Sequence, residues 1–150
     1  MPKATVMAPP RRAVLAAGLS CMLAPRTARA EVAVAGIRCR FADQAVTYRM
    51  WDNATARDLV SRLPLDLTIE DFSTNEKIAR LPRRLDESGH TAFNDETPGD
   101  LCYFLGWGNL AFFHAAYVYR GDLIRLGRIE GSVEPLLVRG TFPLRIERVQ

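Results

Sequence analysis

Apolar and polar residues alternate along most of the chain after residue 30, which is the pattern of half-buried β-strands. Such runs predict strands at residues 37–41, 46–51, 65–70, 76–81, 123–129 and 142–147. Two apolar runs around a glycine-flanked turn predict further strands at 101–105 and 110–113, so seven or eight strands are expected. Asp43-Gln44 is a turn signal between the first two, so we expect a hairpin there. Residues 83–98 contain few apolar positions and predict a long loop, a kind of segment that is usually functional or mobile.

Two short helices are predicted between the strands. Thr55 can cap the first, whose apolar residues Leu59, Val60 and Leu63 fall on one face before Pro64 ends it. The second is predicted at 133–138. Two short helices are too few for a parallel sheet with crossover helices, so the pattern favours an antiparallel barrel or sandwich.

The first thirty residues have the features of an export signal. Arg11-Arg12 precedes twelve uncharged, mostly apolar residues at 13–24, and Ala28-Arg29-Ala30 ends the segment. Twelve residues are too few to span a membrane, which takes about 20. We therefore expect a signal peptide at 1–30, cleaved after Ala30, and one domain at 31–150 that is periplasmic or secreted and not stably inserted in a membrane. The paired arginines suit the twin-arginine route, and an ordinary secretory signal remains open.

Charge excludes a nucleic-acid partner. The whole chain has a formal net charge of +3, but five basic residues and no acidic ones lie in 1–30. The remaining 120 residues contain 15 basic and 17 acidic residues, so the mature domain is slightly acidic and lacks the basic surface of a nucleic-acid-binding protein.

Cysteine and histidine usage predicts no metal and no cofactor. Cys39 and Cys102 are the cysteines of the mature chain, and they have no CxxC spacing. Each lies in an apolar, strand-like run, so a disulfide permitted by export and a pair of buried free thiols both remain open. His90 and His114 stand apart and match no metal-binding or hydrolase motif.

Several short motifs in order resemble the small bacterial cyclophilin-like proteins, which have no assigned activity. The motifs are Asp52–Leu59 with Leu63–Leu65, Glu76–Ile78, Leu81–Arg83, Gly99–Leu101, Trp107–Ala111, and Leu126–Ile129 with Gly131. The resemblance covers nearly the whole mature chain. It implies a closed eight-stranded antiparallel barrel with a short helix capping each end, in agreement with the predicted elements. Some relatives of this domain are joined to flavodoxin-like domains, which makes an accessory role beside a redox partner a further alternative.

The prolyl-isomerising cyclophilins resemble the chain more distantly. Where they carry a glutamine before a Phe-Phe pair, this chain has Ala111, and where they carry a histidine before a Phe-Gly pair, it has Leu123. Their Phe-His-Arg tripeptide has no counterpart. These departures favour a protein that is not an active isomerase.

A peptidyl-prolyl cis-trans isomerase remains the alternative. That reaction needs a guanidinium directed at the amide nitrogen and an apolar socket for the proline ring. Arg80 or Arg83 could supply the first, and Phe112 and Phe113 the second. The same two phenylalanines could equally be barrel core and wall.

The sequence predicts instead a pocket on the side of the barrel that binds a small molecule or a peptide segment. Trp107 stands between two glycines and offers a large apolar face, and Asn109 beside it offers a donor and an acceptor. Arg57, Glu76 and Arg80 would add charge. The alternative is that Trp107 plugs a barrel end and that Arg57 pairs with an acid such as Asp58 or Glu76.

Overall fold

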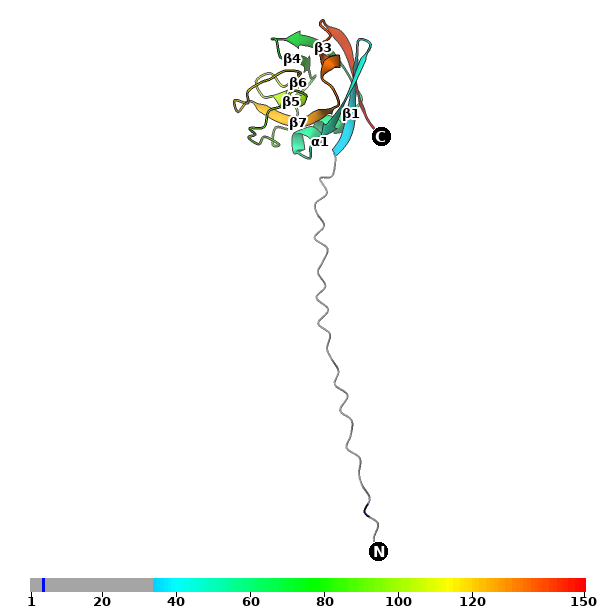
Figure 1. Ribbon diagram of the computed structural model, residues 1–150, viewed down its shortest axis with the longest axis vertical. Coiled ribbons are helices and arrows are strands. Elements are labelled where there is room, and N and C mark those ends of the chain that lie inside the picture. The colour runs from blue at the N-terminus through cyan, green and yellow to red at the C-terminus, as the bar shows by residue number, and fades with distance from the viewer. Residues whose placement is uncertain (1–3, 5–33) are drawn as a thin grey trace.

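Eight antiparallel strands form the domain in the computed structural model, which describes residue 4 and residues 34–150 (Figure 1). The predicted signal peptide at 1–30 lies outside the described residues. The strands are β1 (Val34–Phe41), β2 (Gln44–Met50), β3 (Leu65–Phe72), β4 (Glu76–Arg80), β5 (Asp100–Phe104), β6 (Asn109–Phe113), β7 (Leu123–Glu130) and β8 (Phe142–Arg148). Every strand run expected from the alternation is present.

The strands close into a barrel in the order β1-β2-β7-β5-β6-β4-β3-β8, and β8 pairs with β1 to complete the ring. All neighbouring pairs are antiparallel. Closure gives each strand a partner on both sides, so an apolar strand such as β5 presents no open edge. The barrel inferred from the resemblance is confirmed.

Side chains of β6 show how the wall separates two apolar regions. Leu110 and Phe112 point inward to the main core, whereas Ala111 and Phe113 point outward into a second cluster. That outer cluster also contains Cys102 of β5 and Tyr117 of the β6–β7 loop. The loop covers the outer face here, which is why all five residues of β6 are buried although strands of antiparallel barrels commonly alternate.

Helix α1 (Ala54–Ser61) covers one end of the barrel and buries Ala56, Leu59 and Val60 in the main core. Its cap differs from the predicted one. Asn53 caps the helix, because its side-chain oxygen accepts the backbone N–H of Ala56 at 2.9 Å. Thr55 lies inside the first turn, fully buried, and its hydroxyl makes no hydrogen bond in the described structure.

The second predicted helix is a single 3-10 turn, Glu134–Leu137, which we call η1. Four residues are too few for an α-helix, and Pro135 supplies no backbone N–H. Leu136 nevertheless reaches the main core. Figure 1 shows α1 at the lower end of the barrel and this turn, in orange, near the upper end. The expectation of two capping helices is therefore correct for α1 and wrong in type for η1.

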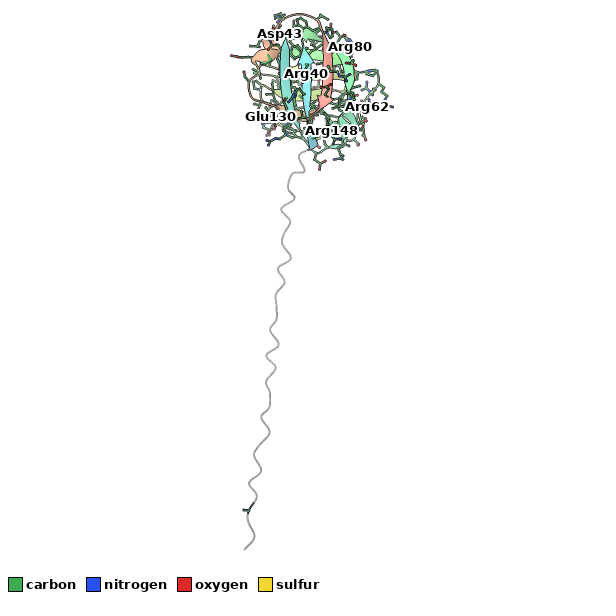
Figure 2. All side chains as sticks on the ribbon, turned by 90° about the vertical axis from the view of Figure 1, so that its right-hand side faces the viewer. Arg40, Asp43, Arg62, Arg80, Glu130 and Arg148 are labelled. Atoms are coloured by element: carbon green, nitrogen blue, oxygen red, sulfur yellow. The ribbon has the colours of Figure 1, made fainter. Side chains whose placement is uncertain are left out.

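Charged side chains cover much of the outer wall beside β1 (Figure 2). Arg40 lies 3.7 Å from Glu147 on β8, and Arg49 lies 3.6 Å from Glu130 on β7. These ion pairs join neighbouring strands at exposed positions, where each contributes little to stability. This side of the barrel is an ordinary solvated surface.

The two described cysteines are free and buried on opposite faces of the wall. Cys39 belongs to the main core inside the barrel, and Cys102 belongs to the outer cluster. Burial raises the pKa of the Cys102 thiol to about 12. Of the two states that the sequence left open, the structure has the buried free thiols.

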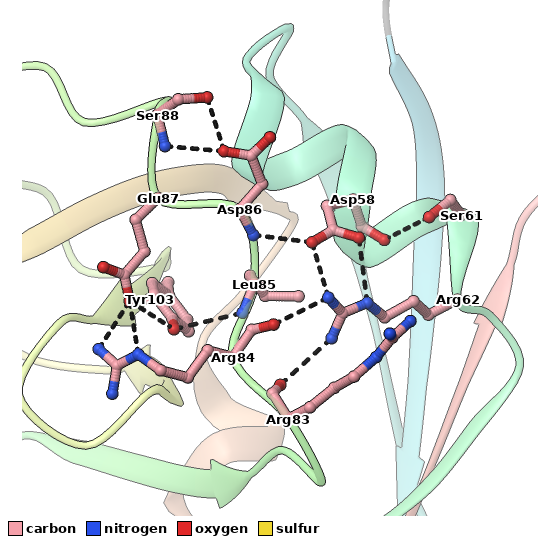
Figure 3. A network of polar contacts seen from close by, with 10 residues as sticks. All are labelled: Asp58, Ser61, Arg62, Arg83, Arg84, Leu85, Asp86, Glu87, Ser88 and Tyr103. Atoms are coloured by element: carbon pink, nitrogen blue, oxygen red, sulfur yellow. Dashed lines mark hydrogen bonds and ion pairs between the residues drawn. The ribbon is translucent and has the colours of Figure 1, made fainter.

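The long segment between β4 and β5 has neither helix nor strand and is fastened to α1 (Figure 3). Asp58 of the helix accepts hydrogen bonds from Arg62 and from the backbone N–H of Asp86, both at 2.7 Å. Arg62 in turn donates to the carbonyl oxygens of Arg83 and Arg84 at 3.2 and 2.8 Å. The predicted loop is thus held in place by side chains of the neighbouring helix.

Candidate functional site: an aromatic cavity on the barrel wall

A cavity of about 470 Å³ lies on the outer face of the barrel, above the outer cluster. It is bounded by the ends of β3 and β4, by β5 and β6, and by the loop that follows β6. Its lining includes five aromatic residues, Phe72, Phe104, Trp107, Phe113 and Tyr117, and three charged ones, Glu76, Arg120 and Asp122. A concave site with apolar walls and a few polar groups is the usual form of a ligand pocket.

Trp107 is held over the cavity by the turn between β5 and β6. Gly108 has φ +67°, a conformation that favours glycine, and its N–H donates to the Phe104 carbonyl at 2.8 Å. The indole meets the rings of Phe72 and Phe104 edge to face, each at a centroid distance of 5.5 Å. Trp107 remains 59% exposed, so it forms an open wall of the cavity and does not plug a barrel end.

Another part of the lining is the stacked pair of Phe113 and Tyr117, which a hydrogen bond to a buried carboxylate holds in place. The Tyr117 hydroxyl donates to Asp100 at 2.7 Å. Asp100 is fully buried and also accepts from Arg128 at 2.8 Å and from the backbone N–H of Thr97 at 3.0 Å. Charge-assisted hydrogen bonds of this kind are strong, so the position of Tyr117 is fixed by more than apolar contact.

Two polar groups of the cavity, the Glu76 carboxyl and the Asn109 side-chain oxygen, lack partners among the described residues. Burial and then the neighbouring charge of Asp122 raise the pKa of the Glu76 carboxyl to about 7. Asn109 is 2% exposed and donates its amide to the Leu110 carbonyl at 3.0 Å, but its side-chain oxygen makes no hydrogen bond in the described structure. A buried acceptor without a partner is uncommon in native proteins.

Four of the residues singled out in the sequence come together here. Glu76 and Phe113 are cross-strand partners on β4 and β6, and Asn109 and Trp107 lie at the other end of β6. All four line the cavity. The alternation of β4 and β6 places the three strand residues on the outer face.

The four other predicted residues do not line it. Phe112 points into the main core and packs against Tyr48, with ring centroids 5.9 Å apart. Arg57 forms an ion pair with Asp52, not with Asp58 or Glu76.

Neither of the two arginines proposed for isomerisation lines the cavity. Arg80 is opposite Asn109 in the strand register, but its guanidinium lies at the surface, 3.5 Å from Glu70 (Figure 2). Arg83 belongs to the long segment, and its carbonyl accepts from Arg62 (Figure 3).

Sequence reasoning did not select Phe72, Phe104, Arg120 and Asp122 for this site. Phe72 ends β3, and Asp122 precedes β7, so they are fifty residues apart and meet only through barrel closure. The available signal in the sequence was the group of aromatic residues near Trp107, which includes Phe104 and Tyr117.

Within residues 34–150, no group of three or more His, Cys, Asp or Glu side chains is arranged to hold a metal ion. No helix in the same part of the chain has the length and apolar character needed to cross a membrane.

These features define a small closed antiparallel β-barrel with an aromatic cavity on its outer wall. The model of the cyclophilin-like family matches residues 39–147, and the chain belongs to that family. Among solved structures, a hypothetical protein from Archaeoglobus fulgidus has a similar fold, with a TM-score of 0.63 and 17% sequence identity. The match covers 77% of this chain and 95% of the archaeal one. No curated protein matches the sequence. Neither of the two matches carries an assigned function.

Proposed function

We propose that this protein is a binding protein that takes a small molecule or a short peptide segment into the cavity beside Trp107. The observation that carries the proposal is the combination of an open aromatic cavity with a half-buried carboxyl group and a buried amide oxygen that lack partners. Glu76 forms no ion pair among the described residues, and the Asn109 side-chain oxygen has no donor. Unpaired polar groups at such a place are costly in the free protein, and a ligand would satisfy them.

Prolyl isomerisation has less support from the same geometry. A guanidinium is needed above the socket for the proline ring, but Arg80 is engaged near Glu70 and Arg83 does not line the cavity. Arg120 is the arginine in the lining, and its side chain is exposed. A protease-coupled assay on a proline-containing peptide tests this reading. We expect a rate equal to that of buffer, and a clear acceleration would favour an isomerase.

Binding is tested with three soluble probes of similar shape: benzylammonium, benzyl alcohol and benzoate. Each is titrated into the protein while amide and indole N–H signals are followed by NMR. We expect at least one probe to shift the Trp107 indole signal saturably. The indole of Trp51 serves as an internal control, because Trp51 packs against Arg125 and does not line the cavity.

Trp107→Ala should abolish that binding, whereas Leu137→Ala should leave it unchanged. Leu137 is also an exposed apolar residue, 51% accessible, but it belongs to η1 and does not line the cavity. If none of the probes binds, or if binding persists in Trp107→Ala, the cavity is not the site.

We also propose that the protein is exported, on the support of the charge and apolar pattern of residues 1–30. Fractionation of bacterial cells that express the full chain should recover the domain outside the cytoplasm and shortened at its N-terminus. Arg11→Lys combined with Arg12→Lys distinguishes the routes: loss of export indicates the twin-arginine route, and retention indicates the ordinary secretory one. Full-length protein in the cytoplasm would contradict export.

A further inference from the structure

We infer that the cavity beside Trp107 is selective for a positively charged group, an ammonium or a guanidinium, on its ligand. This inference rests on the proposed binding function and specifies the chemical class of the ligand. Three separate features of the cavity support it: its charge, its unsatisfied acceptor and its aromatic faces.

Two of the three charged residues that line the cavity are acidic. Glu76 and Asp122 both belong to the lining, and neither side chain forms an ion pair or a hydrogen bond within residues 34–150. Arg120 is the basic residue of the lining, but it is exposed and is not among the groups that alter the ionisation of Glu76. A cation entering between the two carboxyl groups would meet an attractive potential that no side chain of the cavity already cancels.

Asn109 supplies an independent indication of a donor on the ligand. Its side chain is 98% buried and lines the cavity, and its amide group is already used by the Leu110 carbonyl. The oxygen that is left over has no partner and can only accept a hydrogen bond. A ligand N–H or O–H that reaches this buried oxygen, such as that of an ammonium or a guanidinium, would satisfy it, whereas a carboxylate or a carbonyl would not.

The aromatic walls favour the same class of ligand. Trp107, Phe72 and Phe104 form one wall by edge-to-face contacts, and Phe113 stacks on Tyr117 in the other. The faces of aromatic rings carry partial negative charge and attract cations, most strongly for Trp. Elsewhere in this protein such faces are already occupied: the Arg125 guanidinium lies 3.9 Å from the centre of the Trp51 ring. No lysine or arginine ring contact of this kind involves the aromatic residues of the cavity in the described structure.

The surroundings of Glu76 disfavour the charged form of its carboxyl group. Burial and the charge of Asp122 raise the pKa of Glu76 to about 7, so ionising this carboxyl group costs free energy. A bound cation would remove that cost by pairing with the carboxylate. A carboxyl group at this position lowers the stability of the protein when it is ionised. Binding of a cationic ligand in the cavity would explain why a carboxyl group is present there.

The three benzyl probes measure this selectivity directly. At pH 8, where Glu76 is largely ionised, we expect benzylammonium to bind about tenfold more tightly than benzyl alcohol, and benzoate to bind most weakly. Glu76→Gln should lower the affinity for benzylammonium several-fold and leave that for benzyl alcohol unchanged, because the variant keeps the shape and loses one of the two carboxylates, while Asp122 and the aromatic faces remain. Glu130→Gln is the matched control, since Glu130 pairs with Arg49 on another part of the wall, and it should change none of the affinities.

A second set of probes separates the sources of the cation. A blocked lysine, N-acetyl-lysine methylamide, is compared with the same compound acetylated on its side chain. Selective binding of the charged lysine indicates a peptide side chain as the ligand, and binding of benzylammonium alone indicates a free amine. Either result supports a cation site.

The failures are distinguishable. If benzyl alcohol or benzoate binds as tightly as benzylammonium, or if Glu76→Gln leaves the benzylammonium affinity unchanged, the cavity still binds ligands but the inferred preference for cations is wrong. If no probe of either set binds, the proposed binding function fails with it.

Discussion

The ring of Tyr117 stacks almost flat on the ring of Phe113, with centroids 3.7 Å apart and planes 9° from parallel. Phe113 belongs to the barrel wall, and Tyr117 belongs to the loop that covers it. The stack therefore ties a loop to a strand and forms one side of the cavity. The hydroxyl of the same tyrosine reaches the buried carboxylate of Asp100, so a single side chain joins the cavity to the charged network behind it.

Tyr117→Phe tests the polar half of this arrangement. The variant keeps the stack and removes a hydrogen bond to a buried carboxylate, so we expect the free energy of unfolding to fall by about 1.5–3 kcal/mol. Denaturant titration measures the loss. Tyr119→Phe is the control, because the Tyr119 hydroxyl bonds to His90 at an exposed site, and it should cost less than about 1 kcal/mol. Equal losses in the two variants would mean that Asp100 does not depend on the tyrosine.

Most strands were predictable from sequence because they have apolar residues on alternate positions. β5 and β6 were predictable as short apolar runs around a turn, and barrel closure followed from the family resemblance. The prediction was weaker wherever two side chains of the same chemistry stood close together. Asn53 and Thr55 are both good capping residues, and the pattern alone does not decide between them. Similarly, Arg57 had several acidic neighbours, and the structure pairs it with Asp52.

Part of the candidate site was predictable from residues that are neighbours in the sequence or lie on one strand. Trp107 and Asn109 are close in sequence, and Glu76 lies on a strand whose alternation sets its direction. The remainder depends on which loops cross the outer wall, and alternation carries no information about that. Phe72 and Asp122 line the cavity because the turn after β3 and the loop before β7 meet over β4 and β6.

Asn53→Ala should destabilise the protein more than a change at Thr55. Asn53 caps α1 and also donates its amide to the Arg125 carbonyl at 2.9 Å, so we expect a loss of about 1–2 kcal/mol in the free energy of unfolding. Thr55→Val replaces a buried, unpaired hydroxyl with a methyl group of similar size. That change should be neutral or slightly stabilising. Thermal or denaturant unfolding of both variants checks the order, and a larger loss for Thr55→Val would assign the cap to Thr55.

Lys77→Met should be strongly destabilising. Lys77 is fully buried at the end of the barrel interior, where it donates to Asp71 at 2.7 Å and lies 5.9 Å from the ring centres of Phe41 and Phe142. Removing the lysine leaves Asp71 without its main partner, and breaking such a pair costs about 3 kcal/mol or more.

The double variant Lys77→Met with Asp71→Asn supplies the control for this prediction. It removes both charges, so we expect it to recover most of the stability that the single variant loses. Equilibrium unfolding in denaturant measures all three proteins. If the double variant were less stable than Lys77→Met, the loss would come from packing and not from the unpaired carboxylate.

The pH dependence of the free energy of unfolding should reveal the raised pKa of Glu76. Its folded-state pKa of about 7 lies above the ordinary value of 4.5, because burial, and secondarily Asp122, disfavours the charged form. The folded protein therefore binds more protons than the unfolded chain between these values, and the contribution of Glu76 to stability is lost as the pH rises through this range. Arg120 and Tyr117 also line the cavity, and Cys102 lies behind it, close enough for the charge of Glu76 to raise its pKa.

Glu76→Gln removes the titration, so its free energy of unfolding should equal that of the parent near pH 4 and exceed it above pH 7. Because the carboxyl is partly exposed, solvent screening limits the difference to about 1–2 kcal/mol. Denaturant unfolding at a series of pH values measures the difference, in which the titrations shared by both proteins cancel. Glu130→Gln, an exposed residue on another strand, should show no such trend. A constant difference between Glu76→Gln and the parent across the range would mean that Glu76 has an ordinary pKa, and that its surroundings do not disfavour its charged form.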